Sequence, residues 1–230
     1  MAALSSNLIE ERIGFILNTF KKSGRLNAMV LSWMLAVAGT AQASGIEQFK
    51  AFVVNTKTAK GEFLQLQMKT SNGVSKIGKT SSGIFMFARP GKFIWTYTKP
   101  YDQVLQADGD KLYLYDKDLN QVTIKSLGNA IASSPAAILF GNVDLDKNFV
   151  MKDVGLKQGV DWLEATPKTK DSQFETIAIG MKEGVPVGME LRDSFGQLSV
   201  VTLKNFEKNP SFSADQFKFV VPQGAEILRP

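Results

Sequence analysis

Residues Gly73 to Thr80 come closest in this chain to a catalytic motif. Their sequence, GVSKIGKT, matches the pattern G-x-x-x-x-G-K-T, in which backbone amides and a lysine bind nucleotide phosphates. That chemistry requires a buried parallel strand before the loop and a helix after it. Here Leu64 to Met68 alternate apolar residues with glutamine, and residues 83–87 read GIFMF, which is a β pattern. The context favours an exposed antiparallel hairpin, with a nucleotide-binding enzyme as the alternative.

Other catalytic and metal-binding chemistries lack the residues they need. The 230-residue chain contains no histidine and no cysteine, which excludes histidine triads, thiol nucleophiles and the usual zinc ligands. An acidic run at 116–120 begins like a calcium loop, but Gln121 and Leu127 stand where glycine and glutamate are required. A second run at 144–148 fails in the same way. We therefore expect no enzyme, no metal site and no cofactor.

The N-terminal region has the composition of a secretory signal. Basic residues at 21–25 precede an apolar run at 28–39 (AMVLSWMLAVAG), and Ala41-Gln42-Ala43 follows as an A-x-A cleavage site. The run is short for a transmembrane helix. We expect a signal peptide over residues 1–43 and a mature domain over 44–230. An uncleaved amphipathic anchor is the alternative, because the stretch before the apolar run is unusually long.

The charge pattern argues against nucleic acid as a partner. Lysine and arginine together number 27 against 22 acidic residues, a formal net charge of +5. The basic residues are scattered along the chain and form no continuous tract of the kind that binds phosphates. Residues 44–230 are enough for a single hydrophobic core, so one domain is expected.

Most of the mature chain reads as short β-strands between tight turns. An amphipathic helix is predicted over 45–55, with Phe49 and Val53 on its apolar side. A second helix is predicted to begin at Ser134-Pro135 and to carry Ile138, Leu139 and Phe140. Turn dipeptides such as those at 108–109 and 183–184 separate the strands. The strands are expected at 61–69, 83–88, 92–98, 103–108, 111–116, 121–125, 149–156, 160–166, 173–182, 187–193, 198–206 and 217–221.

Several strands are apolar on both faces, which a simple curled sheet does not require. Residues 84–87 (IFMF) and 93–95 (FIW) are the clearest examples. Helices that cover part of one face, or an apolar cavity lined by one face, would explain the pattern. A well-packed sandwich core explains it equally well, so the residue pattern leaves both interpretations open.

The order of several motifs resembles one protein family. R-P-G-x-F-x-W-x-Y at 89–97 is followed by D-G-x-x-L-Y-x-Y-D at 108–116, Q-V-T at 121–123 and S-P-A-x-x-L at 134–139. This order is similar to that of LolA, the family of periplasmic carriers of outer-membrane lipoproteins. The resemblance extends over essentially the whole mature chain.

The resemblance implies a fold, a function and partners. The fold would be α+β and mainly β: an incomplete, half-open antiparallel β-barrel of about 11 strands, with short helices forming a lid over an apolar cavity. The protein would be a periplasmic, monomeric chaperone that binds lipoprotein acyl chains. It would receive them from an inner-membrane ABC-type releasing complex and pass them to the outer-membrane receptor LolB. That receptor is itself lipid-anchored through a cysteine, which this chain lacks.

The resemblance also implies roles for particular residues. Arg89 matches the family arginine that reaches backbone carbonyls of the lid and holds the empty form closed. From the residues alone, the simpler interpretation is an arginine that precedes a Pro-Gly turn and points into solvent. Phe93 matches an aromatic residue near the cavity mouth, and Trp95 shares its strand face. Phe63 matches a cavity phenylalanine, although a bulge could turn Leu64 inward instead.

Two alternatives accompany these assignments. Phe93 and Trp95 could be ordinary core residues, as we expect for Tyr97 and for Phe85 or Phe87. The same curled sheet also occurs in periplasmic domains that sense lipid or lipoprotein, which is the second functional hypothesis.

Overall fold

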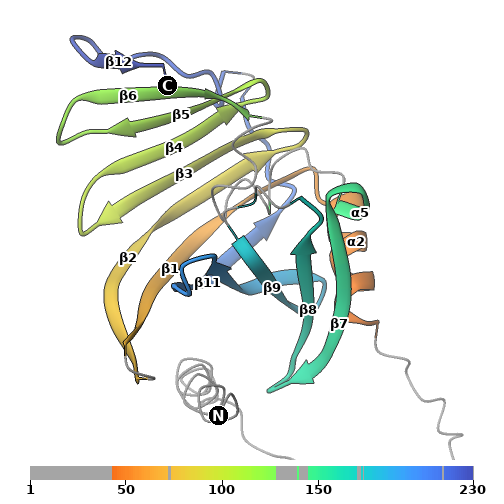
Figure 1. The fold of residues 1–230 in the computed structure, drawn as a ribbon. Helices are drawn as coiled ribbons and strands as arrows, with labels where there is room; N and C mark the ends of the chain where they lie inside the picture. Colours follow the sequence, from red (N-terminus) through yellow and green to blue (C-terminus); the bar gives the residue numbers. More distant parts are fainter. Residues whose placement is uncertain are drawn as a thin grey trace, which may run out of the picture. The chain divides into compact units, whose positions relative to one another are not determined.

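The computed structural model describes residues 43–71, 74–127, 139, 145–169, 172, 174–213 and 215–229. The helices in Figure 1 are α2 (Gly45–Asn55) and α5 (Leu145–Asn148). Within the described part of the chain, no helix combines the length and apolarity needed to cross a bilayer. The strands are β1 (Thr58–Ser71), β2 (Val74–Ala88), β3 (Lys92–Lys99), β4 (Gln103–Asp108), β5 (Lys111–Asp116), β6 (Gln121–Ser126), β7 (Phe149–Lys157), β8 (Val160–Pro167), β9 (Phe174–Lys182), β10 (Val185–Asp193), β11 (Leu198–Lys208) and β12 (Glu226–Leu228).

Two expected elements fall outside what the structure describes. The predicted signal peptide at residues 1–43 lies there except for Ala43. So does the start of the second predicted helix at Ser134-Pro135, of which only Leu139 is described.

The twelve strands found among the described residues belong to one open sheet. Their order is β12-β6-β5-β4-β3-β2-β1-β11-β10-β9-β8-β7, so β12 and β7 are the two outer strands and do not close a barrel. Strands β1 to β6 form one meander and β7 to β11 a second, and β1 pairs with β11 where the two meet. Figure 1 shows β2 to β6 stacked on one side and β9, β8 and β7 on the other. The predicted half-open, mainly antiparallel barrel is confirmed, with twelve strands in place of about eleven.

The first hairpin settles the context of the phosphate-loop pattern. β1 and β2 pair antiparallel from Thr58 with Ala88 to Ser71 with Val74. Residues 74–80 of the pattern therefore lie in β2, and no helix N-terminus follows them. The geometry that a nucleotide phosphate needs is not present, and the nucleotide-binding alternative is wrong.

Alternation along each strand sends one set of side chains to a shared core, on what we call the inner face of the sheet. Phe85 on β2, Trp95 on β3 and Ile179 on β9 are each 1% exposed. Their neighbours in sequence point to the outer face, where Ile84 is 46% exposed and Met86 is half-buried. The two-sided apolar pattern thus combines a buried inner face with a partly covered outer face.

The C-terminal segment covers part of the outer face without forming the strand predicted at 217–221. Gln106 on β4 donates from Nε2 to the carbonyl oxygen of Phe217 at 3.0 Å. The ring of Phe219 stacks on Tyr113 of β5, with ring centroids 4.3 Å apart. Strands β4 and β5 already pair with a neighbour on both edges, so this segment packs against their side chains. The prediction of a strand here is wrong, and the last strand, β12, instead pairs parallel with β6.

Helix α2 has the bounds that its apolar periodicity predicts, residues 45–55. Ser44 and Glu47 form a capping box: Ser44 Oγ accepts from the Glu47 amide at 3.3 Å, and Glu47 Oε2 accepts from the Ser44 amide at 3.0 Å. The buried side of the helix carries Phe49 and Phe52, which are 1% and 2% exposed. The helix therefore forms because a strong cap and an apolar stripe coincide.

Gly83 on β2 should be irreplaceable because the neighbouring strand lies against it. A Cβ atom there would overlap the carbonyl oxygen of Thr96 on β3 and would lie 2.9 Å from the Phe63 ring. We expect Gly83→Ala to lower the free energy of unfolding by about 3 kcal/mol, measured by urea denaturation. Gly188→Ala is the control, since its nearest contacts are ordinary at 3.5 and 3.6 Å and it should change stability by less than about 1 kcal/mol. Equal losses in both variants would contradict this account.

Candidate functional site

Arg89 connects the end of α2 to Leu139. It directly follows β2, and its amide donates to the carbonyl oxygen of Lys57 at 2.7 Å. Its side chain donates from Nε to the Thr56 carbonyl oxygen at 3.2 Å and from Nη2 to the Leu139 carbonyl oxygen at 3.0 Å. Thr56 is the C-cap of α2, so one guanidinium bridges two segments that are far apart in sequence. Arg89 therefore does not project into solvent.

The described partners of the guanidinium are all neutral groups. It lies over the Phe87 ring at 4.9 Å and near the Phe52 ring at 5.5 Å, measured to the ring centroids. Among the described residues no carboxylate forms an ion pair with it. Burial lowers the pKa of Arg89 to about 10, so the group stays protonated at neutral pH. A buried cation with neutral partners is only partly compensated for its lost hydration.

Helix α2 is also fixed at its N-terminal end. The Gln48 side chain donates to Asp161 Oδ2 at 2.7 Å and accepts from the Gly184 amide at 3.1 Å. The Ile46 amide donates to Asp153 Oδ1 at 3.0 Å. These contacts tie the start of α2 to β7, to β8 and to the β9–β10 turn.

Asn209 fixes the other end of the helix. Its Nδ2 donates to the Asn55 carbonyl oxygen at 3.2 Å, and its Oδ1 accepts from the Lys57 amide at 2.9 Å. Helix α2 is thus hydrogen-bonded at its N-terminal end to the sheet and at its C-terminal end to Asn209, which follows β11, whereas the described hydrogen bond to Leu139 comes from Arg89.

The aromatic residues predicted to line a cavity are packed against one another beneath α2. Phe63 stacks on Trp95 with ring centroids 4.0 Å apart, and Trp95 stacks on Phe85 at 5.8 Å. Phe49 stacks on Phe52 at 6.3 Å. The inner-face rings and those of α2 form one core cluster, in which each of these rings is at most 3% exposed.

The remaining predicted cavity residues have varied positions. Phe93 is fully buried in the same cluster. Val53 of α2 is partly buried and packs against the cluster. Leu139 is 1% exposed within the cluster. Ile138 and Phe140 lie outside the described residues. The predicted cavity residues that the structure describes are thus brought together as a packed core.

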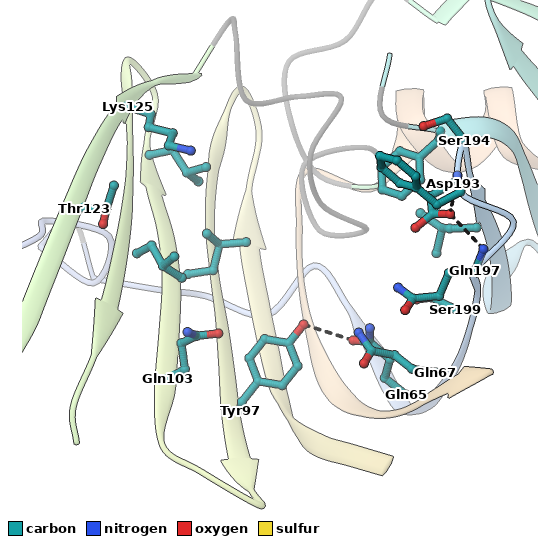
Figure 2. Close-up of a pocket in the computed structure, with 16 residues that line it drawn as sticks. Gln65, Gln67, Tyr97, Gln103, Thr123, Lys125, Asp193, Ser194, Gln197 and Ser199 are labelled. Atoms are coloured by element: carbon teal, nitrogen blue, oxygen red, sulfur yellow. Dashed lines mark hydrogen bonds between the residues drawn. The ribbon is translucent and has the colours of Figure 1, made fainter. Parts of the chain in front are cut away.

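The described pocket lies farther along the inner face, away from α2. Its volume is about 640 Å³, and none of the predicted cavity residues is among its lining residues. It is lined by Gln65, Gln67, Tyr97, Gln103, Leu105, Leu112, Leu114, Thr123, Lys125, Phe174, Leu191, Asp193, Ser194, Phe195, Gln197 and Ser199. Figure 2 shows Gln103 and Tyr97 on one side of this space and Gln65, Gln67 and Ser199 on the other.

The polar lining was not predicted from the sequence. Gln65 is only 7% exposed, and its Oε1 accepts a hydrogen bond from the Tyr97 hydroxyl at 3.0 Å. Phe63, Gln65 and Gln67 share the inner face of β1, whereas Leu64 and Leu66 point to the other face. The alternation of leucine and glutamine was the available signal. The prediction of an exposed hairpin is wrong for Gln65 and Gln67, because alternation alone does not say which face is covered.

Comparisons with known proteins agree with the resemblance. A family model described as outer membrane lipoprotein carrier protein LolA matches residues 54–220. The outer-membrane lipoprotein carrier protein of Cupriavidus necator is 54% identical over 196 residues, covering 85% of this chain and 93% of that protein. The one from Ralstonia nicotianae is 52% identical over 210 residues, covering 90% of this chain and 98% of that protein. A solved LolA superfamily protein from Nitrosomonas europaea covers 77% of this chain and 99% of its own, with 10% identity and a TM-score of 0.47. From the extent of the family match and the identity to these relatives, the chain belongs to the LolA family of outer membrane lipoprotein carrier proteins.

Proposed function

We propose that this protein shields the acyl chains of lipoproteins from water and carries them between the inner and outer membranes. The observation that carries the proposal is the aromatic cluster under a cover joined by Arg89, in a chain that belongs to the carrier family. No covalent chemistry is needed for this activity, so the proposed role is that of a chaperone and not of an enzyme.

The need for a shield follows from the hydrophobic effect. An acyl chain of roughly 15 methylene groups costs about 12 kcal/mol to expose to water, at ~0.8 kcal/mol per group. Three chains cost about three times as much, so free diffusion of a triacylated lipoprotein is negligible. A carrier therefore has to offer an apolar surface that is large and accessible from outside.

The packed aromatic cluster would become that surface when the cover moves. The pocket of about 640 Å³ is of the size that takes one drug-sized molecule, which is too small for three acyl chains. Additional room has to come from separating Leu139 from the cluster that contains rings such as Phe63, Phe93 and Trp95. We infer that these side chains exchange contacts with the cover for contacts with acyl chains.

Arg89 is suited to control that exchange. Because α2 is anchored at both ends by other contacts, the hydrogen bond from Arg89 to Leu139 is the described link that can break without releasing α2. The guanidinium has no carboxylate partner among the described residues, and it regains water when the link breaks. Closure is therefore moderately favourable, and cargo can compete with it.

The cellular setting completes the proposal. Residues 1–43 would be the signal peptide, and residues 44–230 the carrier domain of the periplasm. The donor would be the inner-membrane ABC-type lipoprotein-releasing complex, and the acceptor the outer-membrane receptor LolB. These assignments rest on the composition of the N-terminal region and on the family.

Release of lipoproteins from membranes tests the proposed function. Purified protein comprising residues 44–230, added to spheroplasts that carry newly made lipoproteins, should yield soluble complexes containing one lipoprotein per carrier. Size-exclusion chromatography and quantitative immunoblotting would measure them. A sensing domain would instead bind lipoprotein without extracting it, and failure to extract any lipoprotein would contradict the carrier role.

Replacing Arg89 should impair delivery more than loading. Arg89→Leu removes two charge-assisted hydrogen bonds from the closed form, so cargo should be held more tightly and its transfer to receptor-bearing membranes should slow about tenfold. Uptake from spheroplasts should be nearly unchanged. Arg89→Lys keeps the charge but loses the planar fork of donors, and an intermediate rate is expected.

Arg192→Leu is the matched control, because Arg192 is exposed on β10. It should load and deliver at the rate of the unaltered protein. Normal delivery by Arg89→Leu would remove Arg89 from the release step while leaving the carrier function intact.

A further inference from the structure

We propose that the polar part of the pocket binds the neutral ester and amide groups that join lipoprotein acyl chains to the peptide. The acyl chains would then extend toward α2, and the peptide would leave near the β10–β11 turn. This inference rests on the proposed carrier function. It adds the orientation of the bound lipoprotein in the pocket and a preference for ligands with neutral ester and amide groups.

The inner face changes from apolar to polar along several neighbouring strands. On β1 the inward residues run from Phe63 to Gln65 and Gln67, and on β3 they run from Trp95 to Tyr97. The same change, in the same direction away from α2, occurs on β4 from Leu105 to Gln103, on β2 from Phe85 to Ser81 and on β11 from Val201 to Ser199. We call Gln65, Gln67, Tyr97, Gln103 and Ser199 the polar band; register pairs such as Tyr97 with Gln103 and Gln67 with Ser199 place its members on adjoining strands.

The polar band offers hydrogen-bond donors to the pocket. Tyr97 donates to Gln65 Oε1, which leaves the Nε2 group of Gln65 for other acceptors. The side chains of Gln67, Gln103 and Ser199 line the pocket and make no hydrogen bond to another described residue. Figure 2 shows these groups facing a common space from both sides. Amide and hydroxyl donors of this kind match carbonyl acceptors, and a purely aliphatic ligand would leave them unsatisfied.

The charges around the pocket favour a neutral junction over a phosphate. Only Lys125 and Asp193 among the described lining residues carry charge, and their charges are opposite. A buried phosphodiester needs charge-assisted partners such as an arginine fork, which this lining does not supply. An S-glyceryl-cysteine junction has ester and amide carbonyls without a net charge. The lining therefore favours the lipid-modified end of a lipoprotein over a phospholipid with the same acyl chains.

The pocket also has an exit for a peptide at the end away from α2. Asp193 Oδ1 accepts from the Phe195 amide at 3.0 Å and from the Gln197 amide at 2.8 Å, which fixes the β10–β11 turn. Phe195 lines the pocket while 94% exposed, so the pocket reaches the protein surface at this turn. A peptide attached to the junction could leave there without crossing the aromatic cluster.

A cycle of two ligands and two proteins tests the inference. The probes are a tripalmitoylated S-glyceryl-cysteine peptide and its diether analogue, which lacks the two glyceryl ester carbonyls. We expect residues 44–230 to bind the ester probe about tenfold more tightly than the ether probe, and Gln67→Leu/Gln103→Leu to reduce this ratio to about one. Isothermal titration calorimetry in detergent below its critical micelle concentration would measure the affinities. The same ratio in both proteins would overturn the inference.

Controls separate this inference from the carrier function. Gln223→Leu replaces an exposed glutamine outside the pocket and should keep the full ratio. Ser199→Val provides a smaller change, for which a two- to threefold loss of the ratio is expected if one weak hydrogen bond disappears. Circular dichroism melting would verify folding of every variant. Failure of the unaltered protein to bind either lipopeptide would contradict the carrier function, whereas binding without ester selectivity contradicts only the polar band.

Phosphatidylglycerol with palmitoyl chains is the comparison ligand that distinguishes a lipoprotein junction from a phospholipid as the source of the bound ester groups. The unaltered protein should prefer the lipopeptide about tenfold over this phospholipid, because the neutral band does not compensate a buried phosphate. Equal binding of the two, with equal losses in the double variant, would overturn the assignment to lipoprotein junctions.

Discussion

An apolar inner face on a sheet that does not close is the constraint on which this structure depends. The sheet ends at β12 and β7, so hydrogen bonding alone cannot seal its interior from water. Each fully buried phenylalanine contributes ~1.5–3 kcal/mol relative to exposure. The eight buried aromatic side chains of the described cluster therefore represent on the order of 12–24 kcal/mol, part of which depends on a cover. Helix α2 and Leu139 supply the described part of that cover.

The gross energy of this cover is of the same order as that of a bound acyl chain, so one can replace the other at a small net cost. One acyl chain gains about 12 kcal/mol on leaving water. In the proposed exchange, rings such as Phe63 and Trp95 would remain in apolar surroundings whether the cover or an acyl chain lies against them. The net difference between the closed and loaded forms is therefore much smaller than either gross term. A single interaction that exists only in the closed form, such as the bridge from Arg89 to Leu139, can then shift the balance.

The sequence predicted those features that depend on local pattern. Helix α2 matches its predicted bounds because capping and periodicity agree, and strands β3 to β6 begin at their predicted residues. The prediction of a strand at 217–221 was wrong because alternating apolar residues such as Phe217 and Phe219 occur in any extended segment that packs one side against a surface. Here that surface is the outer face of β4 and β5. Pairing also depends on a free sheet edge, and sequence pattern does not reveal which edges are free.

For the candidate site too, the sequence predicted some features, and others became clear only from the structure. Arg89 was identified through its resemblance to the family, since its residue type and the Pro-Gly that follows are equally compatible with a solvent-exposed turn. The structure adds its two carbonyl partners, which come from segments 33 and 50 residues away in sequence. The predicted exposure of Gln65 and Gln67 was wrong for a different reason. A polar side chain on the inner face of a β-strand has the same sequence pattern as one in solvent, and only tertiary structure distinguishes them.

The separation between Arg89 and the polar band bears on how one carrier can serve many lipoproteins. Arg89 follows the end of β2 nearest α2, whereas Gln67 and Gln103 lie toward the opposite ends of their strands. In the proposed orientation the acyl chains reach the cluster beside Arg89, and the junction and peptide stay near the β10–β11 turn. Breaking the Arg89 link would then depend on the chains, which lipoproteins share, and not on the peptide, which differs among them. The carrier would then recognise the neutral junction at one end of the pocket, and the acyl chains would displace the cover at the other end. Both steps select the lipid modification, and neither depends on the sequence of the attached protein.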